Sequence, residues 1–262
     1  MCLFAFSWKN YPGHKLVLVA NRDEFFERPS LPLHLWDEGF FSGKDLRAGG
    51  AWLGLHPNGK FAALTNYRDM RKVKSNAKSR GNLVKDFLEG DLEPVAYLQR
   101  VAEEMEAYEG FNLLVSDGKK LYYFSNVEKQ IRELSPGLYG LSNELLESPW
   151  PKLKLAKQGL KEKLAADILI PSSLMEAVHS REFAKDEELP DTGMDLESER
   201  LLSPQFISAR GVYGTINTTV ILWKSTGEVT MVERTFDQPQ DKFSDTQVDF
   251  VAIPADLKCK EH

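Results

Sequence analysis

The sequence predicts an α+β fold, a four-layer αββα sandwich in which two antiparallel sheets lie between two pairs of helices. Short apolar runs separated by tight turns dominate the chain, and such hairpins favour antiparallel sheets. Apolar residues recur at helical spacing in two places, one in each half of the chain. Two stacked sheets with helices outside satisfy this order of elements. No internal repeat or low-complexity tract divides the 262 residues, so we expect one domain over residues 1–262.

The first half of the chain begins with two hairpins. Cys2–Trp8 is short and rich in aromatic residues, and a turn separates it from the apolar run Leu16–Ala20. This pattern predicts a buried hairpin. A second hairpin is predicted from Gly50–Leu55 and Phe61–Thr65, around a turn that contains proline and glycine. Residues 24–50 hold prolines and glycines with little periodicity, and we expect a long loop there.

The two helix pairs and the remaining strands follow from the same patterns. Helices are expected at Gly81–Leu88 and Pro94–Tyr108, and again at Pro151–Ala165 and Ser172–Ser180. The further strands that we expect are Phe111–Ser116, Leu121–Ser125, Lys129–Leu134, Val212–Trp223 and Val229–Phe236. Residues 186–203 are acidic and polar, which indicates a mobile loop, and the polar tail after Pro239 is expected to be weakly structured.

Composition and charge exclude several classes of protein. A net charge of −6 argues against a nucleic-acid partner. The densest basic stretch, Arg68–Arg80, is interpreted as a solvated loop, with steering of an anionic ligand as the alternative. Two cysteines, Cys2 and Cys259, fit a reducing compartment. No secretory signal and no membrane-length apolar run is visible, so we expect a cytoplasmic protein without an integral membrane segment.

Cys2 is the residue that points to chemistry. Removal of Met1 would leave Cys2 with a free α-amine beside its thiol. Because an α-amine has a pKa near 8, it can accept the thiol proton and return one to a leaving group. A single residue then supplies both nucleophile and base. The alternative is that Cys2 is a small buried hydrophobe in a first strand.

Polar residues follow three apolar segments at the point where each is expected to end. Asn21–Glu24 follows the run that ends at Ala20, Asn66 and Tyr67 follow the second hairpin, and Asn143 follows a short apolar segment. In a hairpin that starts at Cys2, the end of the second strand lies beside the first residue, so we expect Asn21 and Asp23 near Cys2. A carboxylate there can hold a protonated amine, and amides can donate to an oxyanion. Each asparagine can also be an ordinary turn residue.

The chain resembles the family named after its Asn-Arg-Asp-Glu motif, the transport and Golgi organization 2 family. The matching segments are Met1-Cys2, Ala20–Phe25 with Arg28-Pro29, Gly49–Gly54, Ala63–Tyr67, Gly110–Leu113, Tyr139–Asn143 with Pro149-Trp150, and Tyr213–Thr215. Together they extend from Met1 to about Arg234 and are highly specific. That family looks like a branch of the N-terminal nucleophile hydrolases, which cleave linear amides other than peptide bonds with an N-terminal cysteine. The resemblance therefore implies a fold of the N-terminal nucleophile hydrolase type.

The resemblance also implies roles for individual residues. Cys2 matches the nucleophile, Asp23 the carboxylate that holds its amine, and Asn66 and Asn143 the asparagines on the oxyanion side. The motif residues Asn21 and Arg22, together with Tyr67, are the substrate-binding candidates. The sequence departs from those hydrolases at Ala20, where they carry an arginine three positions before the aspartate. Arg22 is close by, but on an extended strand it faces away from its two neighbours.

Two hypotheses about function follow. The first is a cysteine amidohydrolase that acts on a small acyl amide or thioester. The second is a non-catalytic protein that binds and delivers haem or an acyl lipid, since the resemblance implies intracellular haem handling and lipid or acyl-coenzyme A homeostasis. No cofactor is expected, although haem is a candidate ligand, and no histidine or cysteine spacing indicates a metal site. The oligomeric state stays open.

Overall fold

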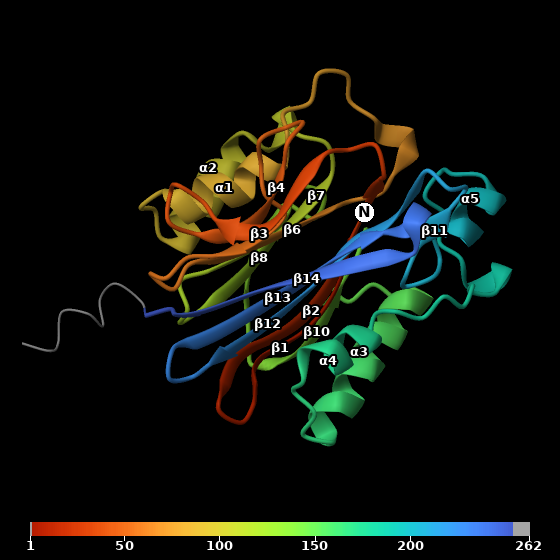
Figure 1. Ribbon diagram of the computed structural model, residues 1–262. Helices are drawn as coiled ribbons and strands as arrows, with labels where there is room; N and C mark the ends of the chain where they lie inside the picture. Colours follow the sequence, from red (N-terminus) through yellow and green to blue (C-terminus); the bar gives the residue numbers. More distant parts are fainter. Residues whose placement is uncertain (1, 254–262) are drawn as a thin grey trace, which may run out of the picture.

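The computed structural model describes residues 2–253 and shows two antiparallel sheets stacked face to face (Figure 1). In the first sheet the strands run in the order β10-β1-β2-β12-β13-β14, with β11 beside β12, and in the second β3 to β9 follow chain order. The strands of the first sheet are β1 (Cys2–Tyr11), β2 (His14–Phe25), β10 (Gly137–Leu141), β11 (Ser208–Ala209), β12 (Tyr213–Lys224), β13 (Glu228–Asp237) and β14 (Lys242–Val251). Those of the second are β3 (Ser30–Leu35), β4 (Phe41–Asp45), β5 (Leu53–Leu55), β6 (Phe61–Asn66), β7 (Phe111–Ser116), β8 (Leu121–Ser125) and β9 (Gln130–Leu134).

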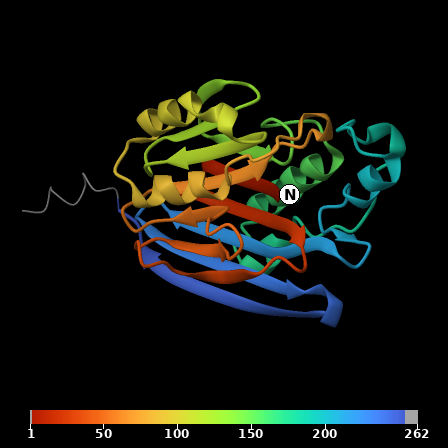
Figure 2. The same ribbon diagram turned by 90° about the horizontal axis from the view of Figure 1, so that it is seen from above.

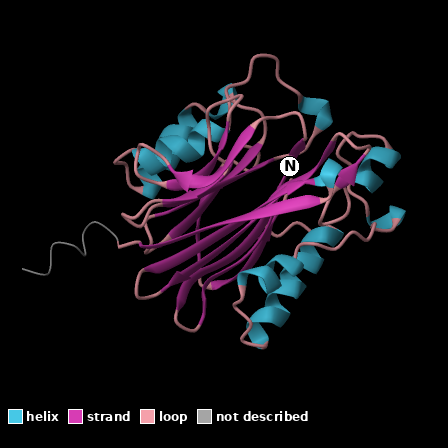
Figure 3. Ribbon diagram, in the orientation of Figure 1, coloured by secondary structure: helices cyan, strands magenta, loops and turns pink. Residues whose placement is uncertain are grey.

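Helices cover the outer faces of both sheets, as Figure 3 shows. The α-helices are α1 (Gly81–Glu89), α2 (Pro94–Glu103), α3 (Pro151–Ala165), α4 (Pro171–Glu176) and α5 (Leu196–Leu201). Short 3₁₀ helices are η1 (Met70–Lys72), η2 (Met105–Ala107), η3 (Asp186–Glu188) and η4 (Gln238–Gln240). The pair α1–α2 packs on the second sheet and the pair α3–α4 on the first. The predicted four-layer αββα sandwich is confirmed.

Successive side chains of β1 and β2 point alternately into two different hydrophobic layers. Phe4 lies in the core between the sheets, where its ring centroid is 5.6 Å from that of Trp52. Leu3 faces the other way and packs with Trp150 and Leu153 under α3. Because side chains point alternately to opposite faces of a strand, both faces of this central hairpin are buried. That burial explains the continuous apolar runs in its sequence.

The prediction of a long loop over residues 24–50 is wrong. β2 continues through the polar motif to Phe25, and β3 and β4 then form a hairpin at the edge of the second sheet. This pair was hidden because its strands are short and only partly buried, and because Pro32 lies within β3. Proline is tolerated on an edge strand, where its missing N–H breaks no ladder bond.

The prediction of weak structure after Pro239 is also wrong for residues 242–251. β14 pairs with β13 along all ten of its residues and lies at the edge of the first sheet (Figure 2). Its inward side chains reach the core, where Phe250 stacks on Phe41 with ring centroids 4.4 Å apart. The polar outer face of this edge strand makes its sequence resemble a tail. Cys259 lies outside the described residues.

Other short elements were also missed. β10 pairs with β1, so the segment before Asn143 is a strand of the first sheet. The expected loop over residues 186–203 contains η3 and α5 and buries Glu199, which is 3% exposed. Among residues 2–253, no helix has the length and apolar character needed to cross a membrane.

Candidate functional site

The first residue of β1 lies opposite the polar motif of β2. The register of the hairpin pairs Cys2 with Arg22 and Leu3 with Asn21. Cys2 is 7% exposed and belongs to the core cluster between the two sheets. Burial raises the pKa of its thiol to about 11, because the thiolate would lose its hydration there.

Arg22 shares the face of Cys2 and reaches across to the second sheet. Its guanidinium donates to the Asp45 carboxylate at 3.1 Å, and Arg28 donates to the same oxygen at 2.6 Å. Asn21 and Asp23 point to the helix side. The expectation that Arg22 faces away from its two neighbours is confirmed. The register therefore places Arg22, rather than Asn21 or Asp23, directly opposite the thiol-bearing residue.

The Asn21 amide is hydrogen-bonded on the helix side of the sheet. Its Nδ2 donates to the backbone oxygens of Val178 at 2.7 Å and Gln205 at 2.9 Å, and its Oδ1 accepts from the Thr218 hydroxyl at 2.7 Å. The Thr218 hydroxyl also lies 2.9 Å from His179 Nε2. Asn21 thus ties β2 and β12 to the segment after α4.

Asp23 is 1% exposed and is held by the neighbouring strand β12. One of its carboxylate oxygens accepts from the Thr215 hydroxyl at 2.7 Å, and its backbone oxygen accepts from the Tyr213 hydroxyl at 3.1 Å. The pairing of β2 with β12 is irregular between Thr215 and Asn217. Burial raises the pKa of Asp23, and the nearby positive charge of Lys152 opposes that rise.

Asn66 and Asn143 meet where the two sheets approach each other. Asn143 Nδ2 donates to the backbone oxygen of Asn66 at 3.0 Å, and the Arg68 N–H donates to the backbone oxygen of Asn143 at 2.7 Å. Ser142, which was not predicted as a site residue, donates from its hydroxyl to the backbone oxygen of Cys2 at 3.0 Å. These bonds join the ends of β1, β6 and β10, so the structure brings Cys2, Asn66 and Asn143 into one region.

A cavity of about 690 Å³ opens beside this junction. Asn66, Tyr67, Arg68 and Tyr213 are among its lining residues, together with exposed apolar side chains such as Phe25 and Val212. Cys2 is not among the described residues that line the cavity, and it is buried. The cavity is therefore adjacent to Cys2 rather than centred on it.

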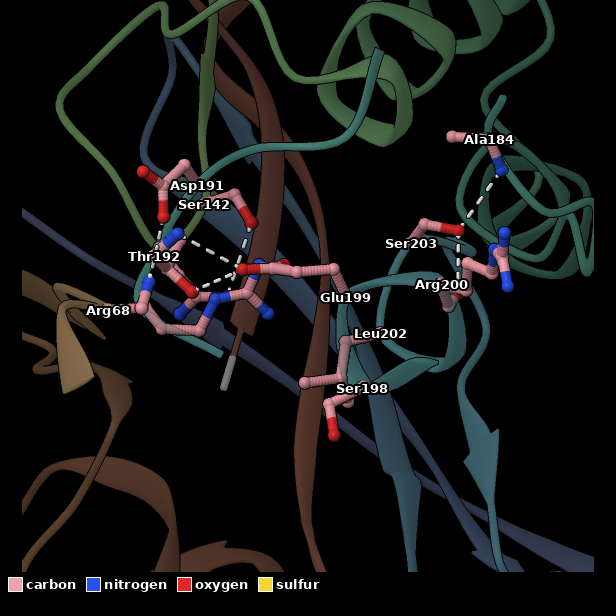
Figure 4. A network of polar contacts seen from close by, with 12 residues as sticks. Arg68, Ser142, Ala184, Asp191, Thr192, Ser198, Glu199, Arg200, Leu202 and Ser203 are labelled. Atoms are coloured by element: carbon pink, nitrogen blue, oxygen red, sulfur yellow. Dashed lines mark hydrogen bonds and ion pairs between the residues drawn. The ribbon is translucent and has the colours of Figure 1, made fainter. Parts of the chain in front are cut away.

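Arg68 is a buried member of the site that the sequence analysis placed in a solvated loop. It pairs with Glu199 at 2.6 Å, and the two side chains are 6% and 3% exposed (Figure 4). The guanidinium also stacks 4.7 Å from the centre of the Trp150 ring. The solvated interpretation is wrong for Arg68, whereas Lys72 in the same stretch is 76% exposed. The sequence around Arg68 does not reveal this burial, because its partner Glu199 lies far away along the chain.

Lys152 is a second missed residue. It lies in the first turn of α3, is 3% exposed, and donates from Nζ to the backbone oxygen of Leu202 at 3.1 Å. Burial lowers the pKa of its ammonium to about 8. Its spacing contained a signal, since Lys152, Ala156 and Leu160 form an i, i+4, i+8 stripe on the buried face of the helix.

Metal ligands do not cluster in the part of the chain that the structure describes. Across residues 2–253, no group of three or more histidine, cysteine, aspartate or glutamate side chains is arranged to hold a metal ion. The cavity lining, which contains Met70, Met194 and three tyrosines, supplies thioether and phenol groups instead.

Comparison with known proteins decides the family. The model of the family "Transport and Golgi organisation 2" matches residues 1–238. The chain belongs to this family. It is 37% identical over 256 residues to the Transport and Golgi organization protein 2 homolog of Bos taurus, covering 89% of this chain and 92% of that one. It is 36% identical over 261 residues to the Homo sapiens homolog, with the same coverage of both chains. Its identity to the Drosophila melanogaster protein is 27% over 282 residues, covering 95% of this chain and 98% of the other.

Solved structures with similar folds are more distant. One is the Caenorhabditis elegans N-acylethanolamine-hydrolyzing acid amidase ortholog, with a TM-score of 0.41 and 12% identity, covering 84% of this chain and 92% of that one. Another is a mutant of the conjugated bile acid hydrolase from Clostridium perfringens, with a TM-score of 0.47 and 7% identity, covering 97% and 98%.

The Arg68–Glu199 pair yields a stability prediction. Arg68→Met leaves the Glu199 carboxylate buried without its guanidinium, and Glu199→Gln leaves the Arg68 charge without its carboxylate. Each single variant is expected to lower the free energy of unfolding by about 3 kcal/mol or more, whereas the double variant loses less than the sum. Chemical denaturation measures all three. Additive losses would contradict a coupled pair.

His179 yields a pH prediction. Burial lowers the pKa of its imidazole to about 4 from an ordinary value of 6.5. Its contribution to stability is therefore fully present above pH 6.5 and is lost as the pH falls towards 4, by about 3 kcal/mol in total. His179→Gln keeps a polar group beside Thr218 but does not titrate. The stability difference between wild type and variant, measured by denaturation from pH 8 to pH 4, is expected to shrink or reverse at the acid end. A constant difference would contradict a buried neutral imidazole.

Proposed function

We propose that the protein is a cysteine amidohydrolase of the N-terminal nucleophile type that acts on a small acyl amide or thioester. The observation that carries this proposal is the position of Cys2, which begins a buried central strand beside Asp23, Asn66 and Asn143. A cavity of about 690 Å³ adjoins these groups, and this volume is in the range of small-molecule sites.

The reaction needs a base at Cys2 itself. Burial raises the pKa of the thiol to about 11, so it carries its proton at neutral pH. Once Met1 is removed, the α-amine of Cys2 takes that proton while the sulfur attacks the carbonyl carbon. The C–N or C–S bond then breaks, and the protonated amine returns the proton to the leaving group. Water attacks the acyl-sulfur bond with the same amine as base, which releases the acid and restores the thiol.

The neighbouring side chains have distinct roles in this proposal. The Asp23 carboxylate, fixed by Thr215, orients the amine. Asn143 Nδ2 has a second N–H besides the one given to Asn66, and it stabilises the oxyanion together with the Asn66 amide. Arg22, opposite Cys2, adds a positive charge that favours the thiolate.

The cavity wall suits an acyl group joined to a polar or anionic part. Its exposed apolar side chains include Phe25, Val73 and Val212, and Lys72 and Lys74 lie among them. Apolar walls bind an acyl chain, and the lysines attract an anion. Tyr67 lines the cavity together with Asn66 and is a further contact for the substrate.

The nucleophile is tested by labelling. Intact mass should show loss of Met1, and an acyl-type electrophile such as a β-lactone should add once to Cys2. Cys2→Ser is expected to lower the labelling rate by about 10³-fold or more, because the hydroxyl is a far weaker nucleophile.

Cys259→Ser is the matched control and should label like the wild type. Active protein that retains Met1 would rule out the amine as base. Labelling that moves to Cys259 would rule out Cys2 as the reactive thiol.

A second candidate is a non-catalytic protein that binds and delivers haem or an acyl lipid. The exposed apolar side chains in the cavity favour it, because such surfaces are typical of binding sites for apolar ligands. Met70, Met194 and Tyr67 offer side chains of the kinds that bind haem iron.

Titration with haem tests this candidate. If the protein binds haem for delivery, we expect a saturable shift of the haem Soret band at about one haem per chain. Val212→Asp puts a charge on the cavity wall and is expected to weaken binding about tenfold, for a loss of roughly 1.4 kcal/mol. Val251→Asp, at an equally exposed valine of β14 away from the cavity, should bind like the wild type. The absence of any Soret shift would rule out the haem version.

A further inference from the structure

Lys152 is a buried cation that the proposed chemistry has not used. Among the described residues its Nζ makes one hydrogen bond, to the backbone oxygen of Leu202, and an ammonium has three protons to donate. No carboxylate of the described residues lies within ion-pair distance of it. The side chain is nevertheless 3% exposed. Burying an ammonium is unfavourable unless an opposite charge compensates for it.

The backbone of Lys152 is tied to the motif strand. Gln205 donates from Nε2 to the backbone oxygen of Lys152 at 3.3 Å, and Asn21 donates to the backbone oxygen of Gln205 at 2.9 Å. Asn21 and Asp23 share the helix-side face of β2, and α3 packs on the neighbouring strand β1 on that same side of the sheet. The start of α3 therefore lies on the same face of the sheet as Asp23, close enough for the Lys152 ammonium and the Asp23 carboxylate to interact.

The charges around Lys152 come from four elements. Asp23 on β2, Cys2 on β1, Arg68 after β6 and Glu199 on α5 all act on its ammonium. Arg68 and Glu199 form their own ion pair at 2.6 Å and largely compensate each other. Asp23 and the Cys2 thiol are the remaining groups that can become anionic.

We propose that Lys152 is a positioning residue for this site: its buried ammonium is the fixed positive charge that stabilises the anionic forms of Asp23 and of the Cys2 thiol. The charge comes from the first turn of α3, a helix of the outer layer. The role of this charge in catalysis rests on the proposed hydrolysis. Its effect on the Cys2 thiol can be measured without a substrate.

Coulomb's law gives the direction in which each substitution shifts the pKa of the Cys2 thiol. Lys152→Met removes a positive neighbour, so the pKa of the Cys2 thiol rises and less thiolate is present at neutral pH. Asp23→Asn removes a negative neighbour, so the thiol pKa falls. The double variant should lie between the two single variants. Because the thiolate is the reactive form, the rate of alkylation reports these shifts, at about tenfold for each pKa unit.

The experiment measures the alkylation of Cys2 by iodoacetamide in the full chain carrying Cys259→Ser, followed by intact mass from pH 6 to pH 10. Lys152→Met is expected to alkylate severalfold more slowly at pH 7, Asp23→Asn faster, and the double variant close to the starting protein. Lys152→Arg keeps the charge and should keep the rate within about twofold. Lys154→Met removes an exposed lysine of the same helix and should change nothing.

The pH profile separates charge from packing. Since the Lys152 ammonium has a pKa of about 8, the rate in the starting protein should rise less steeply around pH 8 than on either side. Lys152→Met and Lys152→Gln should show a smaller change of slope, because only the α-amine of Cys2, with an ordinary pKa near 8, then titrates beside the thiol in this range.

Both variants are expected to fold, since removal of a buried unpaired ammonium relieves a desolvation penalty, and circular dichroism checks this. Folded Lys152→Met or Lys152→Gln with the rate and slope of Lys154→Met would overturn the proposal. Loss of rate in Lys152→Arg equal to that in Lys152→Met would also overturn it, as would slower alkylation of Asp23→Asn. Failure of the protein to hydrolyse any amide or thioester would leave these rates unaffected.

Discussion

The antiparallel pairing of β1 with β2 is the constraint on which the site depends. Its register places Cys2 opposite Arg22, and the alternation of the strand then assigns each motif residue to a layer. Arg22 goes between the sheets with Cys2, while Asn21 and Asp23 go to the helix side. A slip of one residue would exchange these faces and expose the apolar residues of the same strand to the wrong layer. Burial of both faces of the hairpin therefore holds the chemistry in place.

Buried charge organises the surroundings of that hairpin. Arg22 meets Asp45 from the second sheet, and Arg68 meets Glu199 from α5. In each pair, a segment far away in the sequence supplies the compensating charge, because a lone buried ion is unfavourable. Among the described residues, Lys152 and Glu233 are also buried but have no ion-pair partner: Lys152 has one backbone hydrogen bond, and Glu233 accepts from Leu33 and Thr219. Lys152 is the cation of the two, and it interacts with Asp23.

Helices and strands with a strong periodicity of apolar residues could be predicted from the sequence. Partly exposed strands at the edges of the sheets could not. The strands β7 and β12 and the helix α3 lie close to their expected bounds because apolar residues dominate one or both faces. β14 was interpreted as a tail because its exposed face is polar, yet all ten residues pair with β13. Edge strands receive half of their hydrogen bonds and little burial, so their sequences resemble loops.

The amino-acid sequence is enough to predict the sandwich of two antiparallel sheets and the family, and to select Cys2, Asp23, Asn66 and Asn143 as candidate site residues. The three-dimensional arrangement of the strands and helices is needed to show which of them meet, and through which atoms. It placed Arg22 opposite Cys2, joined Ser142 to the backbone of Cys2, and brought Glu199 and Lys152 into the site. The two kinds of information differ in the distance along the sequence over which they act. Periodicity reports which face of an element is buried, whereas a bond between Arg68 and Glu199 spans 131 residues and leaves no pattern in either segment.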